Sequence, residues 1–398
     1  MNILMISSTF PYPPSRGGTE IRTFNLLKYL HSKHHVTLVT QRHSEVNDRE
    51  IEELRQWVTS LVIFPLKSEY NHNLISKIKR FLKSVKTSTP PNVLHRYSPE
   101  MQAWIDDYIL AGKCDIVTCE HSVNEIYIKP EYNNILPTMV NIHSSVYGWS
   151  RNHLEMGASV NIWRDRLYLN LLKRYEKRYT QKFKQIIVTT EDDKNQLLQI
   201  NPQAKIEIIP NGVDLNLFPY RDRDPGGHKL IFIGAMDASH NIDAVRFFTL
   251  EVLPQIQKIY PDTIFTIVGN KPTAPVLKLQ QIPGVIITGK VNSVVEYLHQ
   301  ATICVIPLRT GYGIKNKTLE AMAAGIPVVS SDRGLEGLPS NIGALRANTI
   351  SEYINTISQL FENAQLRKNI SHQGRILVEK EYTWDNIGTR YETVLKKR

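Results

Sequence analysis

The sequence contains little cysteine and no long apolar run. Among its 398 residues, Cys114, Cys119 and Cys304 are the three cysteines. Their spacing matches no metal-ligand motif, and their odd number argues against a disulfide framework. No window of about 18 apolar residues is present that could cross a membrane. The apolar run after Met1 is too short for a signal peptide and has no cleavage-site pattern. We therefore expect a protein of the cytoplasm.

Charge of the two signs is not balanced. Lysine and arginine number 48 and aspartate and glutamate 38, so the formal net charge is +10 and the pI is about 9.3. Such a surplus suits a polyanionic partner, an anionic membrane surface or a phosphate-bearing substrate. It also suits a general solubilising surface, so charge alone does not choose a function.

Short apolar runs alternate with helical patterns along the whole chain. Residues 3–7 and 35–40 are typical of strands, and residues 19–30 between them have apolar side chains at helical spacing. A strand, a helix and a second strand of these lengths favour a parallel pair. Further apolar runs, each predicted to be a strand, occupy residues 114–120, 138–143, 185–190, 229–236, 263–270, 284–290, 302–308 and 326–331.

These units predict an α/β protein with two Rossmann-like, doubly wound domains. Residues 211–228 are rich in Asn, Asp, Pro and Gly and are predicted to be the interdomain linker. Ligands of such sheets bind beyond the carboxyl ends of the strands. We therefore expect the two domains to face a common cleft.

The stretch "GYGIKNKTLEAMAAGIPVV", residues 311–329, joins a glycine loop to a short helix. Gly311 and Gly313 allow the backbone to approach a ligand closely. A helix is predicted to begin near Asn316, and Gly325 marks its end. The free N–H groups at its start would form an anion site.

Charged side chains surround this predicted helix start. Lys315 and Lys317 add positive charge, and Glu320 follows about one turn later. A carboxylate there can accept hydrogen bonds from a vicinal diol such as ribose. The pattern favours a nucleoside diphosphate site. The alternative is a surface helix whose glutamate complements the macrodipole.

The same stretch resembles the signature of retaining glycosyltransferases of family 4, which have the GT-B fold. Supporting likeness lies at residues 13–30, 209–214, 265–270, 282–308 and 382–395, and the similarity covers nearly the whole chain. The resemblance implies an acceptor-binding domain at residues 1–207 and a donor-binding domain at residues 208–379. It also implies a C-terminal helix, within residues 380–398, that packs back on the first domain.

The family implies hexosyl transfer from a UDP- or GDP-sugar to a glycan, lipid-linked or small-molecule acceptor, as in polysaccharide biosynthesis. Its leaving diphosphate is thought to take the proton of the acceptor hydroxyl, so no metal and no other cofactor is expected. The protein then stabilises charge on the departing phosphate. His143, Lys315 and Lys317 are the candidate catalytic residues. The residues expected to bind the donor are Gly17, Gly18, Gly269, Val291, Gly311, Gly313, Ile314, Asn316 and Glu320.

Some of these candidates have a purely structural alternative. His143 ends a predicted strand, where it would touch the donor sugar or be a satisfied core histidine. His121 has a similar place and a weaker match. Gly17 and Gly18 can belong to a simple turn before the first helix.

The sequence departs from the family at two places. Tyr312 stands where the family has a glutamate that helps to hold the donor sugar. Ala235 and Asn241 stand near positions that often carry Arg and Lys. We therefore predict that Lys315 or Lys317 neutralises the donor diphosphate. Successive helical residues are about 100° apart, so the two lysines should not both point the same way.

Two basic segments leave other functions open. Residues 73–86 form a basic amphipathic pattern that suits an anionic membrane at the inner face, or an ordinary packed helix. Residues 171–184 interleave Tyr175 and Tyr179 with basic residues, yet no nucleic-acid motif accompanies them, so we expect no nucleic-acid partner. Asp222 and Asp224 resemble a metal motif of another fold and are read as a solvated turn. A nucleotide-sugar epimerase and a polyanion-binding protein remain alternatives.

Overall fold

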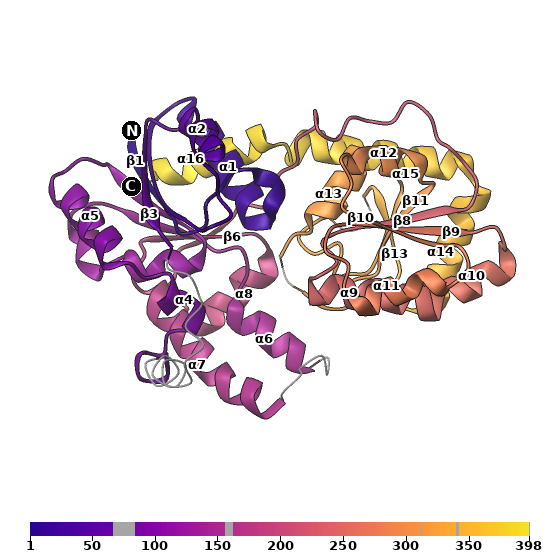
Figure 1. Ribbon diagram of the computed structural model, residues 1–398, viewed down its shortest axis with the longest axis horizontal. Helices are drawn as coiled ribbons and strands as arrows, with labels where there is room; N and C mark the ends of the chain where they lie inside the picture. The colour runs from indigo at the N-terminus through magenta and orange to yellow at the C-terminus, as the bar shows by residue number, and fades with distance from the viewer. Residues whose placement is uncertain (67–83, 156–161, 312, 340–341, 398) are drawn as a thin grey trace. The chain divides into compact units, whose positions relative to one another are not determined.

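The computed structural model describes residues 1–66, 84–155, 162–311, 313–339 and 342–397 (Figure 1). The chain forms two compact units. Unit 1 consists of Met1–Pro210 and Ile387–Arg398, and unit 2 consists of Asn211–Asn386. Each unit is an α/β structure built on one parallel sheet.

Unit 1 contains a seven-stranded sheet in the order β3-β2-β1-β4-β5-β6-β7, with every pairing parallel. Its central strands are nearly continuous apolar runs because helices cover both faces. The strands are β1 (Asn2–Ser7), β2 (His35–Arg42), β3 (Ser60–Pro65), β4 (Ile116–Glu120), β5 (Thr138–Asn141), β6 (Gln185–Val188) and β7 (Ile206–Ile208). The helices are α1 (Gly18–His31), α2 (Asp48–Arg55), α4 (Pro91–His95), α5 (Pro99–Leu110), α6 (Val146–Glu155), α7 (Ile162–Thr180) and α8 (Glu191–Ile200), with short 3₁₀ turns η1 (Pro14–Arg16), η2 (Ser122–Tyr127) and η3 (Pro130–Asn134).

Unit 2 contains a six-stranded parallel sheet in the order β10-β9-β8-β11-β12-β13. In Figure 1, α12, α13 and α15 lie on one side of its strands, and α9, α10 and α11 lie on the other. The strands are β8 (Lys229–Ile233), β9 (Ile264–Val268), β10 (Val285–Gly289), β11 (Ile303–Ile306), β12 (Val328–Ser330) and β13 (Ala344–Arg346). The helices are α9 (Ser239–Phe247), η4 (Phe248–Val252), α10 (Leu253–Ile259), α11 (Ala274–Leu277), η5 (Lys278–Gln281), α12 (Val294–Gln300), α13 (Asn316–Ala323), α14 (Ile350–Glu362) and α15 (Ala364–Glu381).

The predicted α/β class with two doubly wound domains is confirmed, and each of the ten predicted strands overlaps an observed one. The sequence pattern missed β3, β7 and β13. All three lie at sheet edges, and their side chains are partly exposed. Strands β7 and β13 have three residues each and include a charged one, so they show no continuous apolar run, whereas β3 contains four apolar residues at 61–64 and could have been predicted.

The predicted linker, residues 211–228, is instead packed as part of unit 2. The Val213 N–H donates to the Tyr382 carbonyl at 2.8 Å, and buried Arg221 donates to the Ala301 carbonyl at 2.8 Å. Asp224 accepts from Arg367 Nε at 2.7 Å. These residues pack within unit 2 and do not form a free linker, whereas Asp222 and Arg223 lie exposed in a bend, in agreement with a solvated turn.

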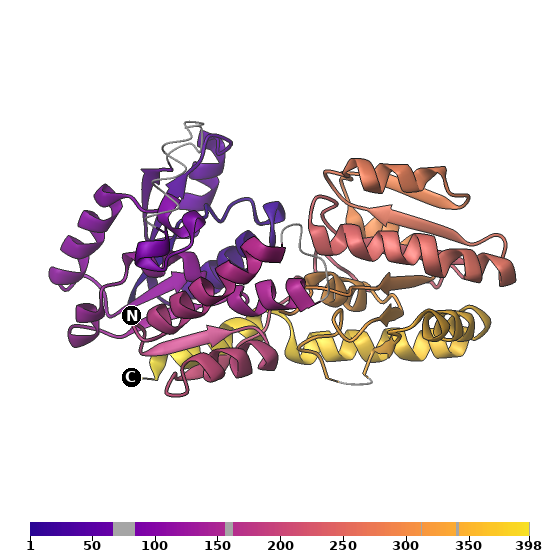
Figure 2. The ribbon, with the colours of Figure 1, turned by 90° about the horizontal axis from the view of Figure 1, so that it is seen from below.

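The last helix, α16 (Trp384–Lys396), begins in unit 2, and its residues from Ile387 onward belong to unit 1. Gly388 allows α16 to pack closely against α1, because a Cβ at this position would lie 2.2 Å from Cγ of Tyr29. The Tyr29 hydroxyl lies 2.8 Å from Thr389 Oγ1. Figure 2 shows the ribbon from below, with the C-terminal segment in yellow.

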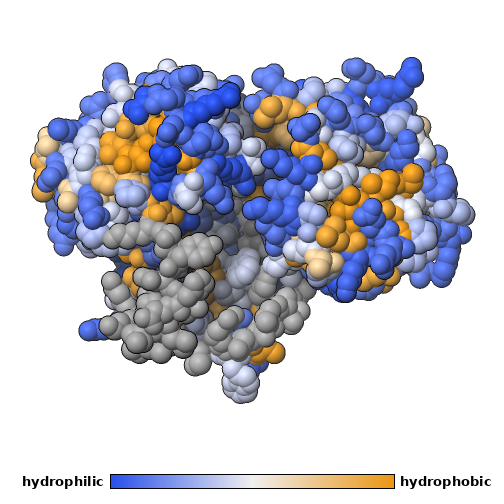
Figure 3. Space-filling model, in the orientation of Figure 1, coloured by the Kyte–Doolittle hydropathy of each residue, from blue (hydrophilic) through white to orange (hydrophobic). Residues whose placement is uncertain are grey.

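Hydrophilic residues cover most of the face in Figure 3, with smaller hydrophobic patches on both units. Of the predicted membrane helix at residues 73–86, only residues 84–86 lie within the described residues. In the other basic segment, Tyr175 and Tyr179 are 1% and 0% exposed, so their rings are not available to stack on bases. Within the described ranges, no helix combines the length and apolar character that crossing a membrane requires.

Candidate functional site

The loop between β11 and α13 is shaped by its glycines. Gly311 has φ +103° and Gly313 has φ +78°, values that L side chains rarely adopt. Helix α13 then begins at Asn316, as predicted. Its N-cap residue, Lys315, makes no capping hydrogen bond through its side chain. The N-cap side chain therefore leaves the first N–H groups of α13 to other acceptors.

The two lysines at this helix start point to different partners. The Lys315 ammonium lies 3.6 Å from Glu336 Oε2 and donates to the Gly313 carbonyl, and this lysine is 8% exposed. The Lys317 ammonium donates to Asn241 Oδ1 at 2.5 Å. It also lies 4.1 Å from the ring centre of Phe232. Lys315 is thus turned to the carboxylate that follows β12, and Lys317 to the end of β8 and the start of α9.

Gly234, directly after β8, makes room for the Lys317 ammonium. A Cβ at Gly234 would lie 2.6 Å from Lys317 Nζ and 2.9 Å from Asn241 Nδ2. Asn241 Nδ2 donates to the Ala235 carbonyl at 2.8 Å, which turns its Oδ1 toward the lysine. Of the two positions where the sequence departs from the family, Asn241 contacts the Lys317 ammonium directly, and Ala235 is joined to it through Asn241. This geometry could not be read from the sequence because it joins residues far apart in the chain.

Lys317 and Glu320 are partly buried and lie three residues apart on α13. Burial lowers the pKa of Lys317 to about 7, and the charge of Glu320 opposes that shift. Burial raises the pKa of Glu320 to about 7, opposed by Lys317. Both groups can therefore change charge close to neutral pH.

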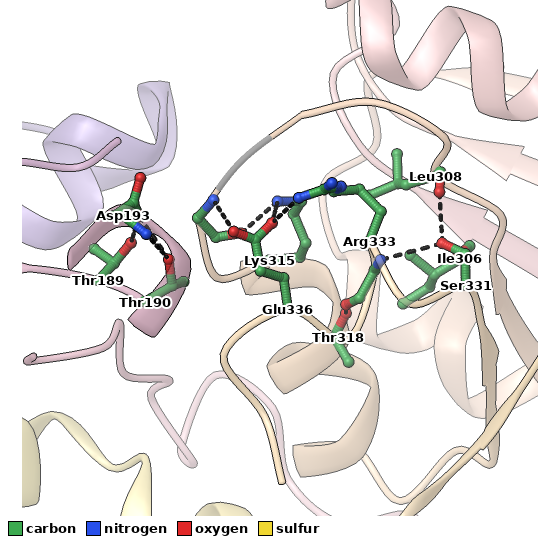
Figure 4. A network of polar contacts seen from close by, with 12 residues as sticks. Thr189, Thr190, Asp193, Ile306, Leu308, Lys315, Thr318, Ser331, Arg333 and Glu336 are labelled. Atoms are coloured by element: carbon green, nitrogen blue, oxygen red, sulfur yellow. Dashed lines mark hydrogen bonds and ion pairs between the residues drawn. The ribbon is translucent and has the colours of Figure 1, made fainter. Parts of the chain in front are cut away.

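A carboxylate that no sequence pattern indicated contacts the glycine loop before α13. Glu336 lies in the turn after β12 and accepts a hydrogen bond from the Gly313 N–H at 3.2 Å. Arg333 NH1 lies 3.1 Å from its Oε2 (Figure 4). No motif marks this residue, and its approach to the loop arises only from the adjacency of β11 and β12.

The other residues predicted to bind the donor in unit 2 have structural roles as well. The Ile314 side chain is 7% exposed and packs in the hydrophobic core, so only its backbone is left for a ligand. A Cβ at Gly269 would lie 1.7 Å from the Gly234 carbonyl oxygen, so close packing requires glycine there. Asn316 Oδ1 accepts from Asn211 Nδ2 at 2.8 Å, and Val291 is partly buried against the core. Their contacts with a donor stay predictions.

In unit 1, the predicted glycine loop leads directly into α1. Gly17 is the N-cap residue, and its φ of −178° is ordinary extended backbone. A Cβ at Gly18 would meet nothing within 4 Å. Neither conformation nor crowding requires glycine at Gly18. The open space there is compatible with a ligand near the start of α1.

His143 follows β5 and lies beside the first turn of α1. Its Nδ1 is 3.4 Å from Thr19 Oγ1, and its ring centre is 4.9 Å from that of His121. Its Nε2 is buried and has no hydrogen-bond partner among the described residues. Burial, His121 and Arg22 hold the pKa of His143 well below its usual value, so its imidazole is neutral at neutral pH. The contact of His143 with a donor sugar stays a prediction.

His121 accepts from the Val123 N–H through Nδ1 at 3.3 Å. Burial, followed by the charge of Arg96, lowers its pKa to about 4. Among the residues that the structure describes, no three His, Cys, Asp or Glu side chains form a group that could hold a metal ion.

Two known curated proteins resemble the chain. A 44.6 kDa protein in the cps region of Klebsiella pneumoniae is 21% identical over 394 residues, which is 96% of each chain. The capsular polysaccharide biosynthesis glycosyltransferase CapM of Staphylococcus aureus is 28% identical over 135 residues. That match covers 30% of this chain and 34% of CapM.

Solved structures share the fold at low sequence identity. Anabaena HepE, solved with UDP and glucose, has a TM-score of 0.69 and 14% identity, with 100% of both chains covered. TarM has a TM-score of 0.69 and 15% identity, covering 100% of this chain and 99% of TarM.

Two family profiles together span most of the sequence. The profile described as Glycosyltransferase Family 4 matches residues 16–217, which is more than half of the chain. The profile described as Glycosyl transferases group 1 matches residues 227–363. The chain therefore belongs to glycosyltransferase family 4. Its two α/β units, each built on one parallel sheet, make it a GT-B glycosyltransferase.

Proposed function

We propose that the enzyme transfers a sugar from a UDP- or GDP-sugar to a carbohydrate, lipid-linked or small-molecule acceptor, with retention of configuration, in polysaccharide assembly. The names of its relatives agree with this proposal. HepE was solved with UDP and glucose, and CapM is named for capsular polysaccharide biosynthesis.

The observation that carries the proposal is the placement of the Lys317 ammonium. It lies beside Gly234 and Asn241, at the carboxyl end of β8, next to the uncapped start of α13. Ligands of doubly wound sheets bind beyond the carboxyl ends of the strands. A diphosphate at this place would meet one ammonium and the positive end of a helix.

In the proposed reaction, the acceptor hydroxyl attacks the anomeric carbon on the face from which the nucleotide leaves. The new bond joins the acceptor oxygen to that carbon, and the bond from the carbon to the β-phosphate oxygen breaks. The hydroxyl proton passes to the departing phosphate. Lys317 stabilises the charge that develops there, and Glu320 accepts hydrogen bonds from the ribose. His143 is neutral, and its Nε2 has no hydrogen-bond partner among the described residues, so it can form a hydrogen bond with a sugar hydroxyl.

The donor role is tested by nucleotide binding and by turnover. UDP or GDP should raise the thermal midpoint of the wild-type enzyme, because a ligand that binds only the folded state stabilises it. A panel of nucleotide sugars should then identify the donor by its hydrolysis. Lys317→Met should lower turnover of that donor by about 10²-fold or more, the range for a lost transition-state donor.

Lys258→Met is the matched control, since it also removes one cation but lies exposed on α10. It should bind nucleotide and turn over donor as the wild type does. Full turnover in Lys317→Met would show that the diphosphate is held elsewhere. Absence of any response to UDP, GDP and nucleotide sugars would contradict the proposed reaction itself.

A further inference from the structure

Glu336 is a buried acidic side chain that binds the backbone of the glycine loop. It is 8% exposed, and its Oε1 accepts the Gly313 N–H at 3.2 Å. Its Oε2 lies 3.1 Å from Arg333 NH1 and 3.6 Å from Lys315 Nζ. Figure 4 shows these groups converging on one carboxylate from the turn, the loop and the start of α13.

The turn that carries Glu336 is held on two sides. Ser331 Oγ donates to the Leu308 carbonyl at 2.5 Å, which ties the turn to the chain leaving β11. Thr318 Oγ1 donates to the Gly334 carbonyl at 2.7 Å, which ties the same turn to α13. A Cβ at Gly334 would lie 2.1 Å from Ser330 Oγ, so the turn is also closely packed. Glu336 therefore projects from a fixed support toward a loop built on two glycines in left-handed conformations.

Charge makes this contact specific for a carboxylate. Two cations, Lys315 and Arg333, face one anion, and the Lys315 side chain is almost fully buried. Removing the anion would take the Glu336 carboxylate away from a buried ammonium, which is unfavourable. A neutral amide at position 336 can still accept the Gly313 N–H, but it cannot balance the two cations. The two functions of Glu336 can thus be separated by substitution.

We propose that Glu336 is a positioning residue for the sugar donor, holding Gly313 and Lys315 so that the loop before α13 keeps the shape that receives the diphosphate. This inference rests on the proposed function. It assigns different tasks to the two lysines of the loop: Lys315 is committed to Glu336, and Lys317 is the cation that meets the donor. Glu336 itself acts through the loop and does not touch the reacting atoms.

The first test needs no donor. Hydrogen exchange followed by mass spectrometry should compare peptides that span residues 309–316 in the wild type, Glu336→Gln and Glu336→Ala. Exchange of these amides should be at least about tenfold faster in Glu336→Ala, because a hydrogen bond and an ion pair to the loop are lost together. Glu336→Gln should fall between the two, since it can keep the Gly313 hydrogen bond. Exposed Glu251→Ala is the control and should match the wild type.

The second test separates positioning from simple stability. Donor KM should rise about tenfold in Glu336→Ala while kcat changes less, the pattern of a lost binding geometry. Lys315→Met should resemble Glu336→Ala, and the double variant should be little worse than either, because the two groups act as one unit. A merely structural role would lower the thermal midpoint and leave KM of the folded enzyme unchanged.

Unchanged exchange at residues 309–316 in Glu336→Ala would overturn the inference, as would an unchanged donor KM in a variant that folds. Additive effects in the double variant would also overturn it. If the wild-type enzyme bound no nucleoside diphosphate, the proposed function would fail first, and the donor role of Glu336 would fail with it. The two failures are therefore distinguished by the wild-type titration.

Discussion

Lys317 and Glu320 show how one partly buried pair can tie ligand affinity to pH. Burial disfavours the charged form of each, and each opposes that effect in the other. Lys317, with its pKa lowered to about 7, carries its proton below pH 7 and loses it above. Glu320, with its pKa raised to about 7, is neutral below pH 7 and negative above. Both changes make the site less favourable to an anion as pH rises.

Affinity for UDP or GDP, whichever the enzyme binds, should therefore fall by about tenfold between pH 6 and pH 8, as the Lys317 ammonium is lost. Isothermal titration calorimetry in buffers of different ionisation enthalpy should show proton uptake on binding above pH 7. In Glu320→Gln the midpoint of this loss should move to lower pH, because Glu320 favours the charged form of Lys317.

Lys317→Met isolates this effect from the titration of the nucleotide itself, which is the same for every variant. Its affinity should be low at all pH values, and the tenfold change should be absent. A pH profile in Lys317→Met that parallels the wild type would assign the dependence to another group.

At the scale of elements, the sequence predicted interior structure better than edges. The interior strands and α13 were predictable because burial on both faces demands apolar runs, and glycines mark the ends of the helix. Strands β7 and β13 were not, because each is three residues long and contains a charged residue, while the apolar run of β3 was missed.

The candidate site divides in the same way. The loop glycines and the two lysines could be found, since they lie together in the sequence next to a recognisable helix start. Asn241 as a partner of Lys317, and Glu336 as a partner of Gly313, could not. Those contacts depend on which strands are neighbours in the sheet and on side-chain directions across it.

Two glycines predicted to bind the donor should respond differently to alanine. A Cβ at Gly269 would lie 1.7 Å from backbone oxygen of Gly234, so Gly269→Ala should destabilise unit 2 by about 3 kcal/mol. A Cβ at Gly18 would meet nothing, so Gly18→Ala at the start of α1 should change stability by less than about 1 kcal/mol. Urea unfolding measures both.

Gly18→Ala should nevertheless weaken nucleotide binding if the start of α1 approaches the donor phosphates. If Gly18→Ala had wild-type stability and wild-type donor KM, this loop would not belong to the donor site. Gly269→Ala cannot test donor binding in this way, because the substitution would disturb the packing of unit 2 and so change binding indirectly.

For the molecule as a whole, the segment that leaves unit 1 and the segment that returns to it are both hydrogen-bonded to one buried network in unit 1. Unit 1 ends at Pro210 and resumes at Ile387. Buried Arg22 on α1 donates to the carbonyls of Ile209 and Pro210, each at 2.8 Å. On the returning helix, the Tyr391 hydroxyl donates to Glu120 Oε1 at 2.6 Å.

Asn141 joins these two anchors. Arg22 Nε donates to Asn141 Oδ1 at 3.1 Å, and Asn141 Nδ2 donates to Glu120 Oε2 at 2.8 Å. Burial lowers the pKa of Arg22 to about 10, which still leaves it charged at neutral pH. Burial raises the pKa of Glu120, opposed by its hydrogen bonds and by Arg22. The guanidinium and the carboxylate therefore support each other's charged forms in an interior that favours neither.

Arg22→Met should lower the free energy of unfolding of unit 1 by about 3–5 kcal/mol, because it leaves Glu120 buried without its counterion. Adding Glu120→Gln to Arg22→Met should recover part of that loss, since the uncompensated charge is then gone. Chemical denaturation of Arg22→Met, Glu120→Gln and the double variant, with hydrogen exchange at β4 and β5 to assign the transition to unit 1, measures all three. If the double variant were as unstable as the sum of the two single ones, Arg22 and Glu120 would act independently. The leaving and returning segments would then be held by separate contacts, and this charge network would not couple them.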